Sequence, residues 1–394
     1  FGYVTHDGDW AHTLGTSLPL MRHRGPDDAG TFESTVGEIR CGLAHTRLAI
    51  LDLSAAGHQP MTSDDGRYTL AYNGEIFNFK EMRRELESLG DRFRSNSDTE
   101  VLLRAWARWD RQCVGRLRGM FAFAVWDRTE AALHLVRDRL GKKPLYYAEA
   151  NGRLAFASEL RVLLGTGLVG GRLSLDGLRS YLAFGSVSDP STIVDGVASL
   201  TPGWMAEYRN GRLALERYWE APLARADESI RFDDAVEDVR ETLRDAVRMR
   251  LVADVPVGVF LSGGIDSSAI VALASEASTR PIHTFTVTFD EEAYSEARHA
   301  DAVARRFGCD HHPVHLPASV AADGIGAAIG ALDQPSADGV NSYFVARAAK
   351  EAGLTVALSG LGGDEVFAGY DNFRRFGRIL RTSRAAWLVG PALA

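Results

Sequence analysis

The chain has 394 residues, which is too long for one ordinary hydrophobic core and predicts two domains. Hydrophobic residues make up 45% of it and charged residues 24%, close to the average of soluble globular proteins, which excludes a disordered chain. The formal net charge of −8 is spread along the sequence, and this argues against the basic face of a nucleic-acid-binding protein.

The cysteines and the apolar segments indicate the cellular compartment. Cys41, Cys113 and Cys309 lie far apart without a CxxC pair, which argues against a disulfide framework and against a zinc site. The sequence has no run of 18 apolar residues, so we expect no membrane span and a cytoplasmic protein. Because the chain starts at Phe1 without an initiator methionine and stops soon after a motif-rich segment, we expect it to be part of a longer protein.

The first half predicts β-strands with a few helices between them. Residues 121–126 and 132–136 are short runs rich in strand-forming side chains. Asn151-Gly152 and Asn210-Gly211 predict hairpins, because Asn and Gly tolerate the positive φ of a type I′ turn.

Two helices are predicted in this half. Apolar side chains recur at helical spacing before Gly90, at Phe79, Met82, Leu86 and Leu89. A second helix is predicted at residues 98–109, with Ser97 as its N-cap and Glu100 completing a capping box.

The second half alternates strands and helices. Strands are predicted at residues 257–261, 281–289, 312–316 and 355–358, with helices at residues 267–276 and 294–307 and two more before the last strand. This alternation predicts a parallel sheet with helices on both faces. A polar and acidic stretch at residues 222–230 marks the boundary, and we expect domains at residues 1–220 and 232–394.

A glycine-rich loop between a strand and a helix predicts a phosphate site. It reads Leu261, Ser262, Gly263, Gly264, Ile265, Asp266, Ser267 and Ser268. Free N–H groups at a helix start, together with serine hydroxyls, form a cradle for anions. Asp266 would repel a phosphate unless a cation lies between them, so the loop predicts Mg²⁺ bound by Asp266. The alternative is a Gly-Ser turn that only caps the helix.

This string resembles the PP-loop of the ATP pyrophosphatases, which cleave ATP between the α and β phosphates. A second glycine-rich string follows the last predicted strand and contains Ser359, Gly360, Leu361, Asp364 and Glu365. Ligands bind at the carboxyl ends of parallel strands, so we expect Ser359 and Gly360 at the ATP site and Asp364 as a second Mg²⁺ ligand. Leu261 and Val287 are candidates for contact with adenine, or else plain core residues.

Polar clusters in the first half suit a site for a free amino acid. Arg47 has the geometry for a carboxylate, and Asp98, with the carbonyls near residues 73–75, suits an α-ammonium group. The Asn73 side chain and the Gly74 N–H group would form an oxyanion hole. Each cluster alone is typical of a solvated turn.

Together these clusters resemble the class II glutamine amidotransferase domain of the asparagine synthetase family. The similarity includes the strings at residues 22–28, 119–124, 137–141, 143–147 and 156–159. It implies an αββα sandwich of the N-terminal-nucleophile hydrolase type, followed by a doubly wound α/β PP-loop domain. It also implies a glutamine pocket that consists of Arg47, Leu48, Ile50, Asn73, Gly74, Glu75 and Asp98.

The family nucleophile is missing from this sequence. In the family it is a cysteine at position one of the mature chain, whose own amine acts as the base. Cys41 lies in the middle of a strand-like run and suits a core position better. We expect Cys-Gly-Ile or a similar string just upstream of Phe1. The alternative is an adenylating cyclase without glutaminase activity, as in the β-lactam synthetases or lasso-peptide cyclases.

The resemblance implies a carbon–nitrogen ligase. Glutamine would supply ammonia, which crosses an internal tunnel and attacks an acyl-adenylate made from Mg-ATP and a carboxylate, giving amide, AMP, pyrophosphate and glutamate. Family members are often homodimers. Asparagine synthetases carry Glu or Asp where this sequence has Leu361, so we expect a carboxylate acceptor other than free aspartate, unless Glu365 or a residue beyond 394 compensates.

Overall fold

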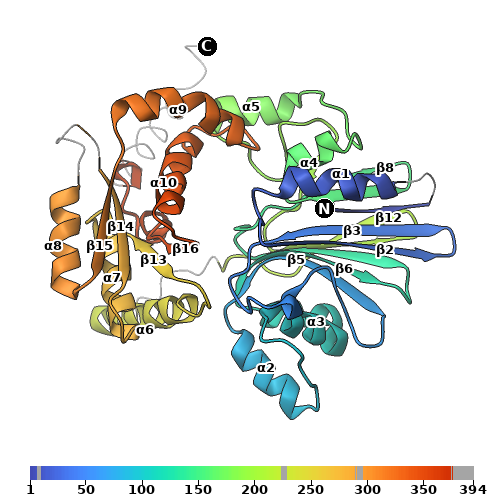
Figure 1. Cartoon of the computed structure of the whole chain (residues 1–394), viewed down its shortest axis with the longest axis horizontal. Coiled ribbons are helices and arrows are strands. Elements are labelled where there is room, and N and C mark those ends of the chain that lie inside the picture. The colour runs from blue at the N-terminus through green and yellow to red at the C-terminus, as the bar shows by residue number, and fades with distance from the viewer. Residues whose placement is uncertain (7–9, 223–228, 289, 291–295, 374, 376–394) are drawn as a thin grey trace. The chain divides into compact units, whose positions relative to one another are not determined.

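The computed structural model describes residues 1–6, 10–222, 229–288, 290, 296–373 and 375 (Figure 1). The chain forms two compact units. The first contains residues Phe1–Asp234, Val252–Val255 and Ala321–Arg347, and the second contains Ala235–Leu251, Pro256–Val320 and Ala348–Ala394. Each unit has its own sheets and core and is described by itself.

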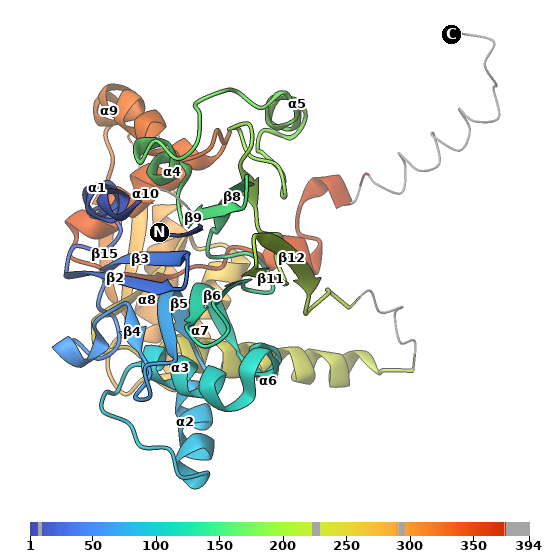
Figure 2. The ribbon, with the colours of Figure 1, turned by 90° about the vertical axis from the view of Figure 1, so that its right-hand side faces the viewer.

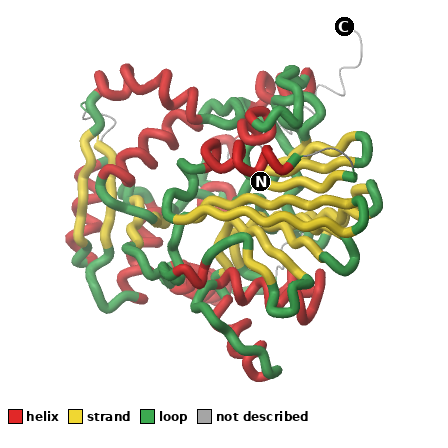
Figure 3. The backbone as a smooth tube through the Cα atoms, turned by 45° about the vertical axis from the view of Figure 1, so that its right-hand side comes forward, coloured by secondary structure: helices red, strands yellow, loops and turns green. Residues whose placement is uncertain are grey.

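Two sheets form the centre of the first unit (Figure 3). Each has six strands, and every strand pairing within them is antiparallel. The first sheet has the order β10 (Ala198–Ser199), β8 (Tyr146–Ala150), β9 (Arg153–Ala157), β1 (Gly2–Thr5), β3 (Ile39–Arg47) and β2 (Asp28–Val36). The second has the order β12 (Arg212–Arg217), β11 (Trp204–Arg209), β7 (Ala132–Arg137), β6 (Gly119–Asp127), β5 (Tyr68–Ile76) and β4 (Met61–Thr62).

Helices cover the outer face of each sheet (Figures 1 and 2). Helices α1 (Ala11–Met21) and α4 (Leu160–Gly165) pack on the first sheet, and α2 (Phe79–Ser88) and α3 (Asp98–Trp109) pack on the second. A third apolar layer, which includes Leu43, Trp126 and Phe156, fills the space between the sheets. The unit is therefore an αββα sandwich, as the resemblance implies. It also contains α5 (Leu175–Phe184) and the 3₁₀ turns η1 (Ala55–Gly57) and η2 (Asp110–Arg116).

The local predictions for this unit are confirmed in most details. Asn151 and Asn210 have a φ of 53°, and the glycine after each also has a positive φ, so both pairs form the hairpin turns β8–β9 and β11–β12. Helix α3 begins at Asp98 and ends at Trp109 as predicted, and the Ser97 hydroxyl accepts a hydrogen bond from the Glu100 N–H group.

Two side chains differ from these predictions. A capping box predicts that the Glu100 carboxylate accepts a hydrogen bond from the N–H group of the N-cap residue, Ser97. It accepts instead from the N–H groups of Arg94 and Ser95, which precede the N-cap. Leu89 is the C-cap of α2 and is exposed, whereas Met82 and Leu86 are buried as the predicted apolar face requires.

A segment from the second half of the sequence packs into the first unit. It connects α9 (Ala318–Ala331) to α10 (Gly339–Glu351). The Asp333 carboxylate accepts hydrogen bonds from the N–H groups of Leu160 and Arg161, at 2.7 and 3.0 Å, and so caps the N-terminus of α4. The Gln334 side chain accepts from the Ile193 N–H group and donates to the Tyr146 hydroxyl. Burial raises the pKa of Asp333.

The second unit contains one parallel sheet. Its strand order is β15 (Asp310–His315), β14 (His283–Thr288), β13 (Val257–Phe260) and β16 (Val356–Leu358). Starting from β13, the chain adds β14 and β15 on one side and then places β16 on the other side of β13. This is the pattern of a doubly wound sheet. Helices α6 (Phe232–Arg250), α7 (Ile265–Ala277) and α8 (Ala297–Phe307) share a core with the sheet, and α11 (Gly363–Phe367) follows β16.

The predicted strands and helices of this unit occur within two to three residues of their predicted ends. Residue 289, at the end of the predicted strand 281–289, lies outside the described residues, as do residues 294 and 295 of the predicted helix 294–307. Residues 223–228 of the predicted boundary stretch also lie outside them. Cys41 and Cys113 are buried, and no described helix is long and apolar enough to cross a membrane.

Candidate functional site

A cavity of about 300 Å³ lies in the first unit. It opens between the end of β3, the end of β5 and the start of α3. All seven residues predicted for the glutamine pocket line it: Arg47, Leu48, Ile50, Asn73, Gly74, Glu75 and Asp98. Residues that are distant in the sequence therefore meet around one space.

Arg47 is the last residue of β3, and its guanidinium group is buried against a loop. Its Nη1 and Nη2 atoms donate to the backbone carbonyls of Ser54, Leu51 and Asp52. These bonds use three of the five N–H groups of an arginine and fix the plane of the guanidinium group. Arg47 also lines the cavity, and no further hydrogen bond of its guanidinium group is seen among the described residues. The loop therefore holds Arg47 in place as a rigid donor.

Asp98 is the first residue of α3 and is buried at the cavity wall. One of its oxygens accepts from the Tyr72 hydroxyl at 2.8 Å and from the Ile76 N–H group at 2.9 Å. Burial raises the pKa of Asp98, and the two donors act against that rise. The backbone N–H groups of Thr99 and of Asp98 itself also act to lower this pKa. A buried carboxylate at the cavity wall suits a cationic ligand group.

Asn73 and Gly74 lie on β5 and face the cavity. The Asn73 amide donates to the Ser158 hydroxyl over 3.5 Å, which is the outer limit of a hydrogen bond, so the amide is only weakly held. A side chain at position 74 would approach Phe121 Cα to 2.7 Å, and packing against β6 therefore already explains this glycine.

His45 is a cavity residue that the sequence analysis missed. It lies two residues before Arg47 on β3, and side chains at that spacing share a face of a strand. That periodicity was the signal that could have found it. Its Nε2 atom lies 2.9 Å from the Tyr72 carbonyl, which only accepts hydrogen bonds, so Nε2 carries the proton. Burial lowers the pKa of His45 to about 4.

The consequence is a neutral imidazole with a free acceptor. The Nδ1 atom of His45 is buried and has no hydrogen-bond partner among the described residues. A buried acceptor without a donor is unfavourable unless a ligand or water supplies one. Three residues of the family strings, Arg24, Lys143 and Ser158, also line the cavity, and burial lowers the pKa of Lys143.

The second unit brings its predicted phosphate residues together at the start of α7. The N-cap residue of this helix is Gly264, and the helix has no side-chain cap. The hydroxyl groups of Ser262 and Ser267 lie 2.9 Å apart and hold the loop closed. Gly263 has a φ of 85°, and a side chain there would approach His299 Cβ to 2.5 Å, so this position requires glycine. The uncapped N–H groups at the start of α7 can donate hydrogen bonds to an anion.

The second glycine-rich string lies against the first. A Cβ atom at Gly360 would stand 2.9 Å from both the Asp266 Cβ atom and the Ser267 nitrogen, and one at Gly363 would overlap the Asp266 carboxylate. The two strings follow β13 and β16, between which the strand order reverses. That reversal is where open α/β sheets bind ligands.

Acidic groups gather beside this contact. Asp364 lies in the first turn of α11, and Tyr370 donates to Glu365 at 2.9 Å. The bond to Glu365, with the charges of Asp364 and Asp266, raises the pKa of Tyr370. The side chains of Asp266 and Asp364 are half-buried, and their carboxylate oxygens are the kind of ligand that suits Mg²⁺.

The remaining predicted ATP residues have mixed surroundings. Leu261 is almost fully buried in the core of the unit, which fits a packing role. Val287 is half-buried near the end of β14, and the Ser359 hydroxyl accepts from the Leu361 N–H group. Leu361 itself is 85% exposed.

Comparisons with known proteins match both units. The model of the glutamine amidotransferase domain matches residues 1–219, and the asparagine synthase model matches residues 238–390. The chain is 36% identical over 360 residues to asparagine synthetase (glutamine-hydrolysing) 1 of Bacillus subtilis, covering 90% of this chain and 55% of that protein. The chain thus spans about half the length of that relative.

Two further relatives differ in name. A putative asparagine synthetase (glutamine-hydrolysing) 2 of Methanocaldococcus jannaschii is 34% identical, over 89% of this chain and 71% of that protein. A protein of Gibberella zeae named amidase chry2 is also 34% identical, over 92% of this chain and 56% of that protein.

Proposed function

Because the chain belongs to the family of glutamine-hydrolysing asparagine synthetases, we propose that it carries out the glutamine-dependent, ATP-consuming amidation of a carboxylate. The observation that carries this proposal is the single cavity that all seven predicted glutamine-pocket residues line. The functional division we propose is a glutaminase domain at residues 1–220 and an ATP-binding synthetase domain at residues 232–394. We also propose a cytoplasmic homodimer.

In the glutaminase reaction, Arg47 binds the α-carboxylate of glutamine and Asp98 binds its α-ammonium group. The rigid hold on Arg47 supports this role, because a donor fixed in place loses little entropy when it binds. Leu48, Ile50 and Glu75 form the wall around the side chain. The Asn73 amide and the Gly74 N–H group stabilise the oxyanion that forms when the glutamine amide is attacked.

The attacking group is a cysteine that precedes Phe1 in the complete protein. Phe1 lines the cavity, and β1 begins at the next residue, which supports a nucleophile at this end of the site. Cys41 is excluded as a substitute because it is buried in the layer between the sheets, where burial raises its pKa.

In the second reaction, the backbone and hydroxyl groups of residues 262–268 hold the phosphates of ATP, with Ser359 and Gly360 beside them. Leu261 and Val287 would contact the base. Asp266 and Asp364 have the oxygen donors that Mg²⁺ prefers, and the ion would neutralise charge on the departing pyrophosphate. The close contact of Gly360 and Gly363 with Asp266 supports a shared site for both strings.

Activity measurements on the complete protein test this function. With glutamine, ATP and the true acceptor, we expect glutamate, AMP and pyrophosphate in equal amounts. Formation of ADP and phosphate instead would refute adenylation. Adenylation without any glutamine hydrolysis would favour the cyclase alternative, in which an amine of the substrate attacks the adenylate.

The acceptor is proposed to be a carboxylate other than free aspartate. The exposed Leu361 can neither hold a cationic group nor accept a proton, and Asp364 is occupied if it binds Mg²⁺. Aspartate-dependent ATP–pyrophosphate exchange should therefore be weak. Asparagine formation at about 1 per second or faster would contradict this assignment and indicate a plain asparagine synthetase.

A further inference from the structure

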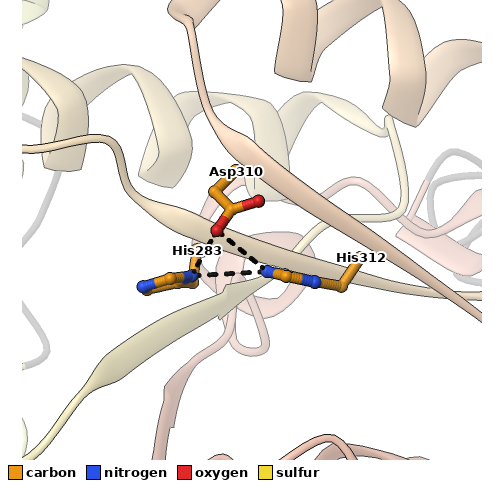
Figure 4. Close-up of side chains that lie close together, drawn as sticks. All are labelled: His283, Asp310 and His312. Atoms are coloured by element: carbon orange, nitrogen blue, oxygen red, sulfur yellow. Dashed lines mark hydrogen bonds and ion pairs between the residues drawn. The ribbon is translucent and has the colours of Figure 1, made fainter.

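Two histidines and an aspartate gather at the start of β14 and β15, away from both sites described above (Figure 4). In the parallel pairing, His283 lies opposite Asp310, and Phe285 lies opposite His312. Residues two apart on a strand share a face, so His283, Asp310 and His312 project from the same face of the sheet.

The three ligand atoms have the spacing of a metal site. His283 Nδ1 and Asp310 Oδ2 are 3.1 Å apart, His312 Nε2 and Asp310 Oδ2 are 3.3 Å apart, and the two nitrogens are 3.3 Å apart. Ligands about 2.0 Å from a tetrahedral Zn²⁺ ion are separated by about 3.3 Å. The triangle therefore has the size of one face of a zinc coordination tetrahedron.

Packing holds this arrangement in place. The His312 ring stacks on Phe285, with the centroids 4.8 Å apart and the planes at 18°, and on His283 at 5.6 Å. All three polar side chains are partly exposed, at 44%, 52% and 40% for His283, Asp310 and His312, so an ion can enter from solvent. A fourth position would remain open to water.

We propose that His283, Asp310 and His312 bind one divalent transition-metal ion, with Zn²⁺ as the physiological candidate. Imidazole nitrogens select such ions over Mg²⁺, which prefers oxygen ligands. The site lies at the amino ends of the strands, whereas the glycine-rich strings follow their carboxyl ends. The six residues of β14, from His283 to Thr288, span about 17 Å, so this ion is distinct from Mg²⁺ at Asp266.

The bound ion would join two neighbouring strands. β15 is at the edge of the sheet and pairs only with β14 among the described strands. Two of the ligands come from β15 and one from β14, so the ion would resist separation of the edge strand. The competing explanation is a plain hydrogen-bonded cluster in which both rings donate to the same Asp310 oxygen.

Metal titration of the complete, untagged protein separates these explanations. After dialysis against a chelator, Zn²⁺ should bind with one equivalent per chain by calorimetry, and Co²⁺ should give the visible absorption of a tetrahedral complex. His283→Ala and His312→Ala should each weaken binding by at least about 100-fold, beyond the loss expected for an indirect partner of a ligand.

The matched control is His311→Ala. His311 lies between Asp310 and His312 on β15, but its Nδ1 atom contacts the Thr284 hydroxyl at 2.9 Å, on the opposite face of the sheet. This variant should bind Zn²⁺ like the wild type, and ATP–pyrophosphate exchange assayed with Mg²⁺ but without Zn²⁺ should stay unchanged in all three variants. Absence of stoichiometric binding, or equal loss in His311→Ala, would overturn the proposal.

Discussion

In the first unit the proposed ligand-binding residues line a cavity whose charged side chains, Arg47 and Asp98, are buried, whereas in the second they stand on glycine-rich loops at the end of a parallel sheet. Burial is the main cause of the lowered pKa of His45 and Lys143 and of the raised pKa of Asp98. In the second unit, the fit depends on backbone atoms that approach each other closely at Gly263 and Gly360. Substitutions in the first unit should therefore act through buried charge, whereas in the second unit both the carboxylates and the shape of the glycine-rich loops should matter.

The largest effect is expected from the carboxylates of the second unit. Asp266→Asn or Asp364→Asn should lower ATP–pyrophosphate exchange by about 100- to 1000-fold, because each removes a charge that holds Mg²⁺. Glutamine hydrolysis should persist. Glu276→Gln is a control, since Glu276 is an exposed residue in the last turn of α7. Exchange within a few-fold of wild type in either aspartate variant would refute the phosphate site.

The buried histidine of the first unit predicts a pH effect. The pKa of His45 is about 4 in the folded protein and about 6.5 when unfolded, so its contribution to stability is complete above pH 6.5. As the pH falls, the unfolded chain takes up the proton first and stability is lost. The difference amounts to about 2 kcal/mol at pH 5.

Urea unfolding at pH 7.5 and pH 5 measures this effect. His45→Gln removes the titrating group, so the variant should lose about 2 kcal/mol less stability than the wild type between these two pH values. An identical loss in both proteins would show that His45 is not held neutral.

Asp98→Asn should weaken the binding of glutamine rather than destabilise the fold. The amide can still accept hydrogen bonds from Tyr72 and Ile76, but the charge that faces the α-ammonium group is gone. We expect the KM for glutamine to rise by about 10- to 100-fold, as for loss of a charge-assisted hydrogen bond. Activity with free ammonia should be unchanged. Asp91→Asn, which disturbs only a surface pair with Arg108, should leave the KM unaltered.

A smaller effect is expected from backbone fit. Gly360→Ala places a methyl group against Asp266 and Ser267 and should lower exchange by about tenfold. Gly326→Ala in α9 is the matched control, because nothing lies within 4 Å of its added carbon atom. A normal exchange rate in Gly360→Ala would show that the two strings do not need their close contact.

The same contrast explains how much the sequence could predict. Hairpin turns, the bounds of α3 and the glycine-rich strings follow from neighbouring residues, so they could be identified without a structure. The meeting of Arg47, Asn73 and Asp98 came from the family resemblance and not from local patterns. His45 was missed because its role depends on the Tyr72 carbonyl of another strand in the other sheet.

Contacts between distant strands and segments could not be predicted either. The cluster of His283, Asp310 and His312 exists only in the register of β14 with β15. No sequence pattern indicates that residues 321–347 pack with the first unit. The boundary stretch at residues 222–230 marks only where the chain leaves the first domain, and not whether a later segment returns to it.

The carboxylate of Asp333 has a practical consequence for protein dissection. It supplies the cap of α4, a helix that begins 173 residues earlier in the sequence, and its neighbour Gln334 holds the Ile193 N–H group. A fragment cut at residue 220 would therefore carry a helix with unsatisfied N–H groups and an uncovered surface. Expression of the first domain alone should yield a product that is easily cleaved by proteases near Leu160, even though its sandwich core is complete.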